Sequence, residues 1–405
     1  MMNLMTVQIG LVGKPNAGKS TFFAASTLID VKRAPYPFTT INPNIGVGYA
    51  KLRCVCKEFG VKDNPKNSFC INGWRFAPVE LMDVAGLVPD AWKGRGLGNK
   101  FLDELRRADA LIHIIDISGS TDVEGRPLKP GEHDPLIDVT FLEKEIDMWM
   151  FQILKRDWDR ISRTIDIKSS EKARELYERL SGLGIKLESI ENALLELSLQ
   201  NKRVSSWSDE EILEFIKFVR WASKPMLIAA NKIDLPYAEE NYHRLKREIG
   251  DKYTIIPVSA ESELALKKAA KAGLIEYIPG EKEFKIIKKL NERQKKALEY
   301  IKERVLEKWG STGIQKAIDT TVFELLHMIA VFPVENENKL TDHNGNVLPD
   351  VHLVHSGITA KEFAYLIHTE IGEKFAFAID VRNKKRLSAD YKLKHRCVIK
   401  IVTSR

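Results

Sequence analysis

The sequence has few cysteines and no long apolar run. Four cysteines among 405 residues are too few and too unevenly spaced for a disulfide framework, so reduced thiols are expected. No stretch reaches the roughly 18 apolar residues that a membrane span needs. Residues 1–6 also lack the basic segment, followed by an apolar one, that marks a secretory leader. The expectation is a cytoplasmic protein that does not enter a membrane.

Neither sign of charge dominates the chain. Lysine and arginine number 63 against 56 aspartates and glutamates, which gives a formal net charge of +7. This excess permits binding to phosphate-rich partners without requiring it. Hydrophobic residues at 44% and charged residues at 29% are ordinary for a globular protein and exclude a collagen-like or largely disordered chain. The length predicts two or three domains.

Short apolar runs alternate with helical patterns through much of the chain. Runs at 6–12, 79–83, 110–117, 225–230 and 253–258 are rich in β-branched residues, and each precedes a polar loop. Such alternation predicts an α/β fold with a mainly parallel sheet and helices on both faces. Ligands of such folds gather at the carboxyl ends of the strands.

The alternation stops in three regions, which suggests further domains. Residues 136–201 show helical spacing among many charges, which predicts a helical hairpin inserted into the α/β domain formed by 1–135 and 202–281. Residues 282–327 predict a lysine-rich helical connector that completes this domain. Residues 328–405 predict a small α+β domain, because short alternating strands surround the turn residues at 342–346.

A phosphate-binding pattern follows the first predicted strand. Residues 13–20 read GKPNAGKS and satisfy G-x-x-x-x-G-K-[ST] between a strand and a helix. Lys19 is expected to bridge the β- and γ-phosphates and Ser20 to bind Mg²⁺. Chance would produce the pattern in such a chain on the order of once in a hundred. The residues expected to contact nucleotide here are Gly13, Lys14, Pro15, Asn16, Ala17, Gly18, Lys19, Ser20 and Thr21.

An acidic motif, Asp83-Val84-Ala85-Gly86, ends the run at 79–83. A carboxylate at a buried strand end is costly unless it faces a cation or hydrogen-bond donors. We therefore expect Asp83 to hold Mg²⁺, through a water molecule, and the Gly86 N–H to approach the γ-phosphate. Asp-x-x-Gly alone is a common turn, but its strand context favours this role.

A threonine pair lies between these two motifs, in Tyr36-Pro37-Phe38-Thr39-Thr40. A threonine here would complete the Mg²⁺ shell and fold onto the γ-phosphate, and we choose Thr40 over its neighbour. A polar turn flanked by prolines is the alternative. The predicted metal ligands are then Ser20, Thr40 and Asp83. The predicted catalytic residues are Lys19, Thr40 and Gly86. Phe38 and Thr39 are expected to be further nucleotide contacts.

A base-reading pattern, Asn231-Lys232-Ile233-Asp234, follows the run at 225–230. The Asp234 carboxylate can accept hydrogen bonds from N1–H and the 2-amino group of guanine, whereas adenine presents an acceptor at N1. Unpaired buried polar groups can discriminate by roughly 10⁴-fold. Lys232 is expected to pack along the base and Asn231 to tie this loop to the phosphate loop. Ser259-Ala260-Glu261 would offer the Ala260 N–H to guanine O6.

Together these residues resemble the Obg family of translation-factor-class GTPases, and within it the YchF-like branch. The likeness rests on GKPNAGKS, YPFTT, DVAGLVPDAWKGRGLGNKFLDELRRADALIHIID and NKID. The tail from NGNVLPDVHLVHSG onward resembles the ubiquitin-like TGS domain. The resemblance implies a P-loop NTPase G domain, a coiled-coil insertion and association with ribosomes, through rRNA or tRNA. Some YchF-like members have altered the base-reading motif and prefer ATP, but the motif is intact here, so GTP and GDP are expected.

The residue after Asp-x-x-Gly is Leu87, where many switch GTPases have a glutamine that orients water. This predicts intrinsic hydrolysis of roughly 10⁻³ s⁻¹ or less. Activation would come from a partner residue or from K⁺, since Asn16 resembles the asparagine that coordinates potassium in several GTPases lacking that glutamine. A P-loop kinase or ATPase, and an RNA-binding scaffold with a vestigial site, are the alternatives.

Two basic clusters predict contact with RNA, which the resemblance implies would be ribosomal RNA. The chain is expected to be a monomer. A solvated charged face is the alternative, particularly for the first cluster. Cys54, Cys56 and Cys70 offer three thiolates without an obvious fourth ligand, so a zinc site is not expected. His113 lies in an apolar run and is expected in the core. The clusters are Lys285, Lys288, Lys289, Arg293, Lys295 and Lys296, and Arg382, Lys384, Lys385, Arg386, Lys392, Lys394 and Arg396.

Overall fold

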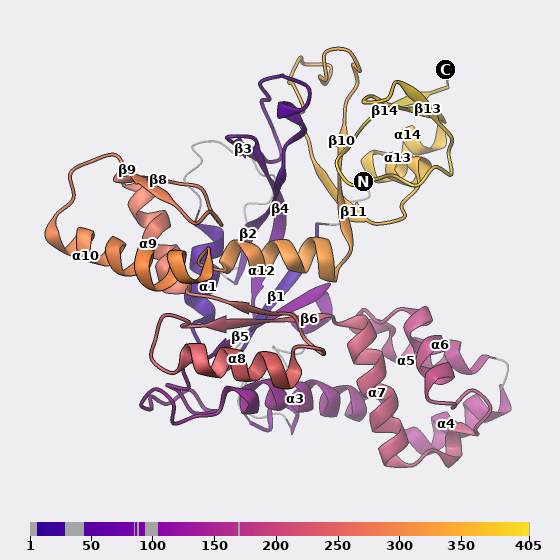
Figure 1. The fold of residues 1–405 in the computed structure, drawn as a ribbon. Coiled ribbons are helices and arrows are strands. Elements are labelled where there is room, and N and C mark those ends of the chain that lie inside the picture. Colours follow the sequence, from indigo (N-terminus) through magenta and orange to yellow (C-terminus); the bar gives the residue numbers. More distant parts are fainter. Residues whose placement is uncertain are drawn as a thin grey trace. The chain divides into compact units, whose positions relative to one another are not determined.

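The computed structural model describes residues 6–28, 44–84, 86, 89–93, 104–168 and 171–404 (Figure 1). The chain divides into two compact units. We call Gln8–Phe23 with Met82–Glu261 the P-loop unit, and Met1–Val7 and Ala24–Leu81 with Ser262–Arg405 the C-terminal unit. Phe38, Thr39, Thr40 and Leu87 lie outside the described residues, and so do the expected contacts of these four.

Four parallel strands form the centre of the P-loop unit, in the order β1 (Gln8–Val12), β5 (Ala110–Asp116), β6 (Met226–Asn231) and β7 (Ile255–Pro257). Every residue of β5 and β6 is buried. Strands that are buried on both faces are near-continuous apolar runs, which is why these runs could be recognised in the sequence. All the predicted runs contain strands, and their polar loops follow the carboxyl ends.

The insertion in the P-loop unit is helical and is more divided than the expected hairpin. Four helices replace the expected two, and α7 then leads back to β6. The αL conformation of Asp157 (φ 59°) separates the first two helices, and Gly184 (φ 72°) precedes the fourth. The P-loop unit contains α3 (Pro135–Lys155), α4 (Trp158–Ile167), α5 (Lys172–Leu180), α6 (Leu187–Glu196), α7 (Asp209–Ser223) and α8 (Ala238–Ile249).

Strands that the sequence did not reveal begin the C-terminal unit. In this unit, β2 (Ile45–Arg53) lies beside β4 (Trp74–Asp83), which pairs antiparallel with β3 (Phe69–Ile71). The sheet is therefore mixed rather than parallel throughout. Met82 and Asp83 at the end of β4 belong to the P-loop unit, where the Val84 N–H donates to the Leu11 carbonyl at 3.2 Å.

A short strand lies inside the predicted lysine-rich helical region 282–327. This strand, β9 (Phe284–Ile286), pairs antiparallel with β8 (Ile275–Tyr277), which lies just before the region. Three-residue strands carry too little periodicity to be recognised in a sequence. The helices of this region are α10 (Glu292–Ile301), α11 (Glu307–Trp309) and α12 (Ile314–Thr320). Helix α9 (Ala260–Lys271) comes before β8, and α1 (Lys19–Thr27) follows the P-loop.

The end of the chain forms a five-stranded sheet in the order β11-β10-β14-β12-β13. Its strands are β10 (Met328–Pro333), β11 (His352–His355), β12 (Phe375–Asp380), β13 (Lys385–Leu387) and β14 (Cys397–Thr403). Only the β10–β14 pair is parallel among the described strands of this sheet. Helix α13 (Ala360–Ile367) starts at a Thr359–Glu362 capping box and buries Phe363. The short helix α14 (Thr369–Glu373) follows.

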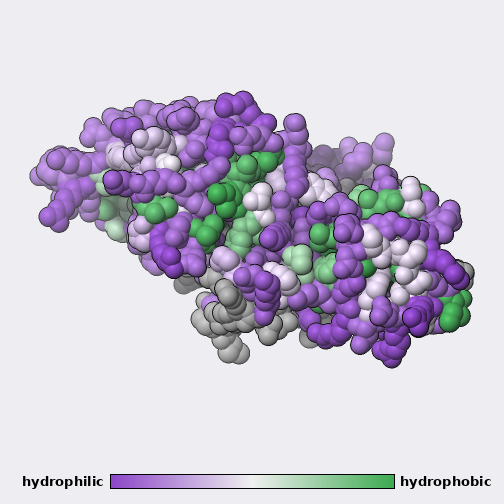
Figure 2. All heavy atoms as spheres, turned by 90° about the horizontal axis from the view of Figure 1, so that it is seen from below, coloured by the Kyte–Doolittle hydropathy of each residue, from purple (hydrophilic) through white to green (hydrophobic). Residues whose placement is uncertain are grey.

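Short helical segments complete the described elements. The 3₁₀ segments are η1 (Val55–Lys57), η2 (Ala91–Lys93), η4 (Ser181–Leu183) and η5 (Val204–Ser206), and the π-helical ones are η6 (Lys302–Leu306) and η7 (Thr321–Leu325). Among the described residues, no helix is both long enough and apolar enough to span a membrane. On the face shown in Figure 2, hydrophilic side chains cover most of the surface, and hydrophobic ones form small groups between them.

Candidate functional site

The phosphate loop brings its lysine and serine to the acidic motif. The Lys19 ammonium forms an ion pair with Asp83, and the Ser20 hydroxyl lies 3.4 Å from the other carboxylate oxygen of Asp83. Residues from the ends of β1 and β4 thus meet at one edge of the sheet. Gly86 is close as well, because a Cβ at that position would lie 3.6 Å from Pro15.

Both glycines of the loop are required by their surroundings. A Cβ at Gly13 would lie 2.4 Å from the Ile114 carbonyl oxygen, and one at Gly18 would lie 2.1 Å from the Asn231 side-chain nitrogen. Gly18 also has a φ of +96°, which side chains rarely adopt. The loop therefore approaches β5 and β6 more closely than any other residue type allows.

The side chains of Lys14, which is buried, and Asn16, which is exposed, both bond to other parts of the protein. The Lys14 ammonium donates to the Thr121 carbonyl at 2.7 Å and pairs with Asp138 at 2.9 Å, and the residue is only 3% exposed. The Lys14 side chain is thus bonded within the protein, and its predicted contact with nucleotide would be made by its backbone. Asn16 donates its amide to the Gly125 carbonyl at 2.9 Å. The segment 117–126, which the sequence did not single out, thus holds the phosphate loop from the side.

Asn231 links three of the predicted loops. Its amide nitrogen donates to the Ala17 carbonyl at 2.8 Å, and its amide oxygen accepts the Ala260 N–H at 3.0 Å. The expected tie between the base-reading loop and the phosphate loop is therefore present. The same side chain also fixes the Ser259-Ala260 turn.

Asp116 is a residue that the sequence interpretation missed. It is fully buried at the end of β5 and accepts hydrogen bonds from the hydroxyls of Ser118, Ser120 and Thr121. Lys232, which was expected to pack along a base, donates to the same carboxylate at 2.8 Å. Burial raises the pKa of Asp116, but the hydrogen bonds from Lys232 and Ser118 outweigh it and lower the pKa below its ordinary value. Its position at a strand end, like that of Asp83, was the available signal.

The remaining predicted residues differ in exposure. Asp234, Thr21 and Pro15 are partly exposed, whereas Ala17, Ser259 and Ala260 are buried and Glu261 is exposed. Buried residues can contribute to a nucleotide site only through their backbone. His113 is 1% exposed, and burial lowers its pKa to about 3. A histidine packed in the core is the outcome that the sequence predicted for this position.

The donor set fits a magnesium nucleotide. Ser20 and Asp83 offer the hard oxygen ligands that Mg²⁺ prefers. Lys19 places a positive charge beside them, next to the N-terminus of α1, where backbone N–H groups favour phosphate. Lys19 and Asp83 pair with each other in this structure. When a nucleotide binds, Lys19 can exchange this ion pair for a phosphate and Asp83 can exchange it for Mg²⁺, without a change of fold.

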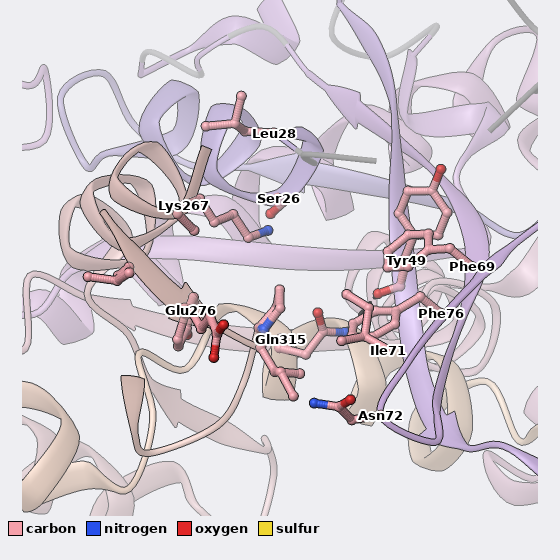
Figure 3. A pocket seen from close by; sticks show the side chains of 15 residues that line it. Ser26, Leu28, Tyr49, Phe69, Ile71, Asn72, Phe76, Lys267, Glu276 and Gln315 are labelled. Carbon is pink, nitrogen blue, oxygen red and sulfur yellow. Dashed lines mark hydrogen bonds between the residues drawn. The ribbon is translucent and has the colours of Figure 1, made fainter. Parts of the chain in front are cut away.

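A separate cavity of about 360 Å³ lies within the C-terminal unit and takes none of its lining from the predicted site. In Figure 3 the rings of Tyr49, Phe69 and Phe76 line one side, and Ser26, Leu28 and Lys267 come from the other. The Phe69 and Phe76 rings stack with centroids 4.6 Å apart. Lys267 is held by the Ala25 carbonyl at 2.6 Å, and burial lowers its pKa. The cavity thus has an apolar wall of aromatic rings and one ammonium group, that of Lys267, which is fixed by a hydrogen bond.

The basic cluster of the tail is partly neutralised. Arg382 pairs with Glu58 at 2.7 Å, and Arg396 pairs with the same glutamate. Lys384, Lys385 and Arg386 are exposed. Only part of the predicted cluster therefore offers charge to a partner.

Comparison with known proteins identifies the parts of the chain. Residues 8–140 match the family model described as 50S ribosome-binding GTPase, and residues 229–336 match "Obg-like GTPase YGR210-like, G4 motif-containing domain". Residues 344–403 match the TGS domain. The matched segments cover both the phosphate loop and the base-reading loop.

Individual relatives agree with these family matches. An uncharacterized GTP-binding protein of Methanocaldococcus jannaschii is 51% identical over 398 residues, which is 98% of this chain and 99% of that protein. The ribosome-binding ATPase YchF of Bacillus subtilis is 30% identical over 271 residues, 64% of this chain and 68% of that one. A crystal structure of a GTP-binding protein from Pyrococcus horikoshii OT3 covers 98% of this chain and 100% of its own, with a TM-score of 0.79 and 40% identity. The chain belongs to the Obg-like P-loop GTPases, with YchF among its relatives, and carries a TGS domain.

Proposed function

We propose that the chain is a molecular switch that binds and hydrolyses GTP. The observation that carries this proposal is the Asn231 side chain, which bonds to Ala17 and to Ala260. A single amide thereby holds the phosphate loop, the base-reading loop and the Ser259-Ala260 turn in one arrangement. A purine nucleotide that fills the site contacts all three loops at once.

Guanine is the base that this site fits. Asp234 follows directly on the strand end that Asn231 fixes, and its carboxylate can accept from both N1–H and the 2-amino group. The Ala260 N–H is committed to Asn231 at 3.0 Å, so its expected bond to O6 would have to be shared or exchanged. Relatives with the printed name ribosome-binding ATPase make ATP the competing ligand.

Hydrolysis depends on Mg²⁺, Lys19, Thr40 and Gly86 in this proposal. Mg²⁺ held by Ser20, Thr40 and Asp83 would neutralise phosphate charge. Because Leu87 cannot orient a water molecule, the isolated chain hydrolyses GTP at roughly 10⁻³ s⁻¹ or less. A partner residue or K⁺ would accelerate the reaction. Only the amide oxygen of Asn16 would be available to bind K⁺, because its amide nitrogen donates a hydrogen bond to the Gly125 carbonyl.

The ribosome is the proposed partner, in the cytoplasm and with the chain as a monomer. Two observations support it: relatives are named ribosome-binding ATPases, and exposed cations lie on the TGS domain. An RNA-binding scaffold with a vestigial nucleotide site is the second candidate. It differs from the switch in having no turnover and no difference between its GTP and GDP forms.

Calorimetric titration with GTP, GDP, ATP and ADP tests the proposal, together with the variant Asp234→Asn. The wild type should prefer guanine nucleotides by at least about 100-fold, since a mismatched base leaves the carboxylate unpaired. The variant should bind GTP more weakly and xanthosine triphosphate more tightly than the wild type does, because an asparagine amide can donate a hydrogen bond to the 2-oxo group of xanthine. Glu240→Gln on the exposed side of α8 is the control and should bind like wild type. A preference for adenine nucleotides in the wild type would refute the assignment.

A further inference from the structure

The β3–β4 hairpin and the chain leading to it bring three cysteines and an aspartate together. Cys54 follows β2, Cys56 lies in η1, Asp63 lies in the following loop and Cys70 lies on β3. One ligand atom from each of these four residues lies within 4.8 Å of all the others. Cys54 and Cys56 are buried, and Asp63 and Cys70 are partly buried. All four residues belong to the C-terminal unit.

The distances between these atoms suit a tetrahedral metal ion. The sulfurs of Cys56 and Cys70 are 3.9 Å apart, and the Cys54 sulfur is 3.2 Å from an Asp63 oxygen. Zinc binds thiolate at about 2.3 Å and carboxylate at about 2.0–2.2 Å, so a tetrahedral site separates its ligand atoms by about 3.5–3.8 Å. Small movements of the side chains would bring the four atoms to these separations. The fourth ligand, which the sequence did not reveal, is the Asp63 carboxylate.

We propose that Cys54, Cys56, Asp63 and Cys70 form a structural zinc site. Three sulfur ligands exclude Mg²⁺ and Ca²⁺, which prefer oxygen, and favour a borderline-soft ion such as Zn²⁺. Four protein ligands close the coordination shell, which is the arrangement of a structural site rather than a catalytic one. Nothing in the proposed GTPase reaction requires this site.

Arg75 supports the charge of such a site. Three thiolates and a carboxylate carry more negative charge than one Zn²⁺ neutralises, and the Arg75 guanidinium lies 3.1 Å from Asp63 with none of its side chain exposed. Its other bonds, to Ser68 and to the Leu348 carbonyl at 2.8 Å each, fix its position.

The site would hold the hairpin against the last domain. The loop between Asp63 and Cys70 is bonded to residues 347–351 through the N–H groups of Asn64 and Lys66, at 3.0 and 2.7 Å. The cysteines themselves lie in a core cluster with Phe332, from β10. A metal that closes the loop would therefore stabilise the packing between this hairpin and the TGS domain.

Metal analysis of the full chain tests the site. Protein purified in reductant without chelator should contain one zinc ion per chain, released when an organomercurial titrates the thiols. Replacement of zinc by Co²⁺ should give thiolate-to-cobalt charge-transfer absorption and the strong visible bands of a tetrahedral ion. Cys56→Ser and Cys70→Ser should weaken metal binding by more than the roughly 10–100-fold typical of outer-shell changes. Asp63→Asn should keep the charge-transfer absorption and bind more weakly.

Cys397→Ser is the matched control, because Cys397 is a fourth free cysteine on β14 outside the cluster. It should retain zinc and the cobalt spectrum. The wild-type measurements need no variant, so misfolding of a serine variant does not affect them. The proposal is wrong if the wild type takes up neither Zn²⁺ nor Co²⁺, if Cys56 and Cys70 instead form a disulfide in the purified protein, or if Cys397→Ser loses metal as the other variants do.

Discussion

Asp116 organises two loops through one buried carboxylate. It accepts hydrogen bonds from the segment 118–121 and from Lys232 of the base-reading loop. A buried carboxylate without hydrogen-bond donors would destabilise the fold, so Asp116 requires these donors. In return, the carboxylate fixes the positions of the groups that donate to it. The conformation of Lys232, with a φ of +64°, is held by this bond and by the strand end before it.

Substitution of Asp116 by Asn should therefore affect stability and binding together. The amide removes the charge that pairs with Lys232 and places a donor beside hydroxyl donors. We expect the free energy of unfolding to fall by about 1–3 kcal/mol and the affinity for guanine nucleotide to fall about tenfold. Urea denaturation and calorimetric titration measure the two effects. Asp251→Asn, at an exposed position, should stay within about 0.5 kcal/mol of the wild type.

The contrast between Asp83 and Asp116 shows what the sequence reveals about single residues. Both end buried strands, and the same argument about buried carboxylates applies to both. Asp83 was recognised because a glycine follows at a fixed distance, whereas the partners of Asp116 lie in a loop of ordinary composition and in a lysine 116 residues away. Asp63 was missed for the same reason, since its thiol neighbours are brought to it only by folding.

Helix α12 docks on β2 through side chains that bond to the strand backbone. Gln315 donates to the Tyr49 carbonyl, and Asp319 accepts the Lys51 N–H at 2.7 Å. Burial raises the pKa of Asp319 from 3.8 to about 7. Between these pH values the folded chain holds a proton that the unfolded chain has lost. The free energy of unfolding contributed by this group is therefore largest in acid, falls as the pH rises to about 7, and then levels off.

Asp319→Asn should remove this pH dependence. The amide oxygen can still accept from Lys51 and Gln315, and no charge remains to be buried. We expect the variant to gain stability over the wild type as the pH rises from 4 to 8, by at most about 4 kcal/mol. Chemical denaturation at several pH values gives the difference curve. A constant difference across this range would contradict the assigned titration, and Asp251→Asn should follow the wild-type curve.

The phosphate loop depends on a close approach at Gly18. Gly18→Ala would place a methyl group 2.1 Å from the Asn231 amide nitrogen, so Asn231 would have to leave its bonds to Ala17 and Ala260. Nucleotide affinity should fall at least about 100-fold, while circular dichroism stays native-like, because the strands themselves are untouched. Gly182→Ala is the control, since a Cβ there would meet nothing within 4 Å. Its affinity should equal that of the wild type.

Elements were predictable where periodicity was strong. The five apolar runs contain β1, the end of β4, β5, β6 and β7, because strands buried on both faces need apolar residues throughout. The division of the insertion into four helices depended on single αL residues, and β3, β8 and β9 have three residues each. β2 was missed too, since its burial pattern mixes partly exposed and buried positions. These features follow from tertiary contacts rather than from local pattern.

At the scale of the whole molecule, the proposed contact with RNA depends on the exposed cations of the TGS domain. Asp380 accepts the Arg382 N–H at 3.0 Å and shapes the turn between β12 and β13. This turn presents Lys384, and Lys385 begins β13 directly after it. Arg386 follows with its guanidinium 3.8 Å from the Phe377 ring centroid. Arg382 itself is paired with Glu58, so it is a poor choice for a test of RNA binding.

Lys384→Glu with Lys385→Glu should reduce binding to ribosomes or isolated rRNA. The affinity should fall at least about tenfold at moderate salt, and the slope of log affinity against log salt should decrease by about 0.7–0.9 for each lost phosphate contact. Guanine-nucleotide affinity should stay unchanged, because neither lysine belongs to the predicted nucleotide site. The control pair is Lys361→Glu with Lys374→Glu, at exposed positions of the same domain. It changes the net charge by the same amount, so it distinguishes binding at a local surface from general electrostatic attraction to RNA. Equal losses in both pairs would leave only non-specific electrostatics, and unchanged binding in the first pair would exclude this turn as the contact.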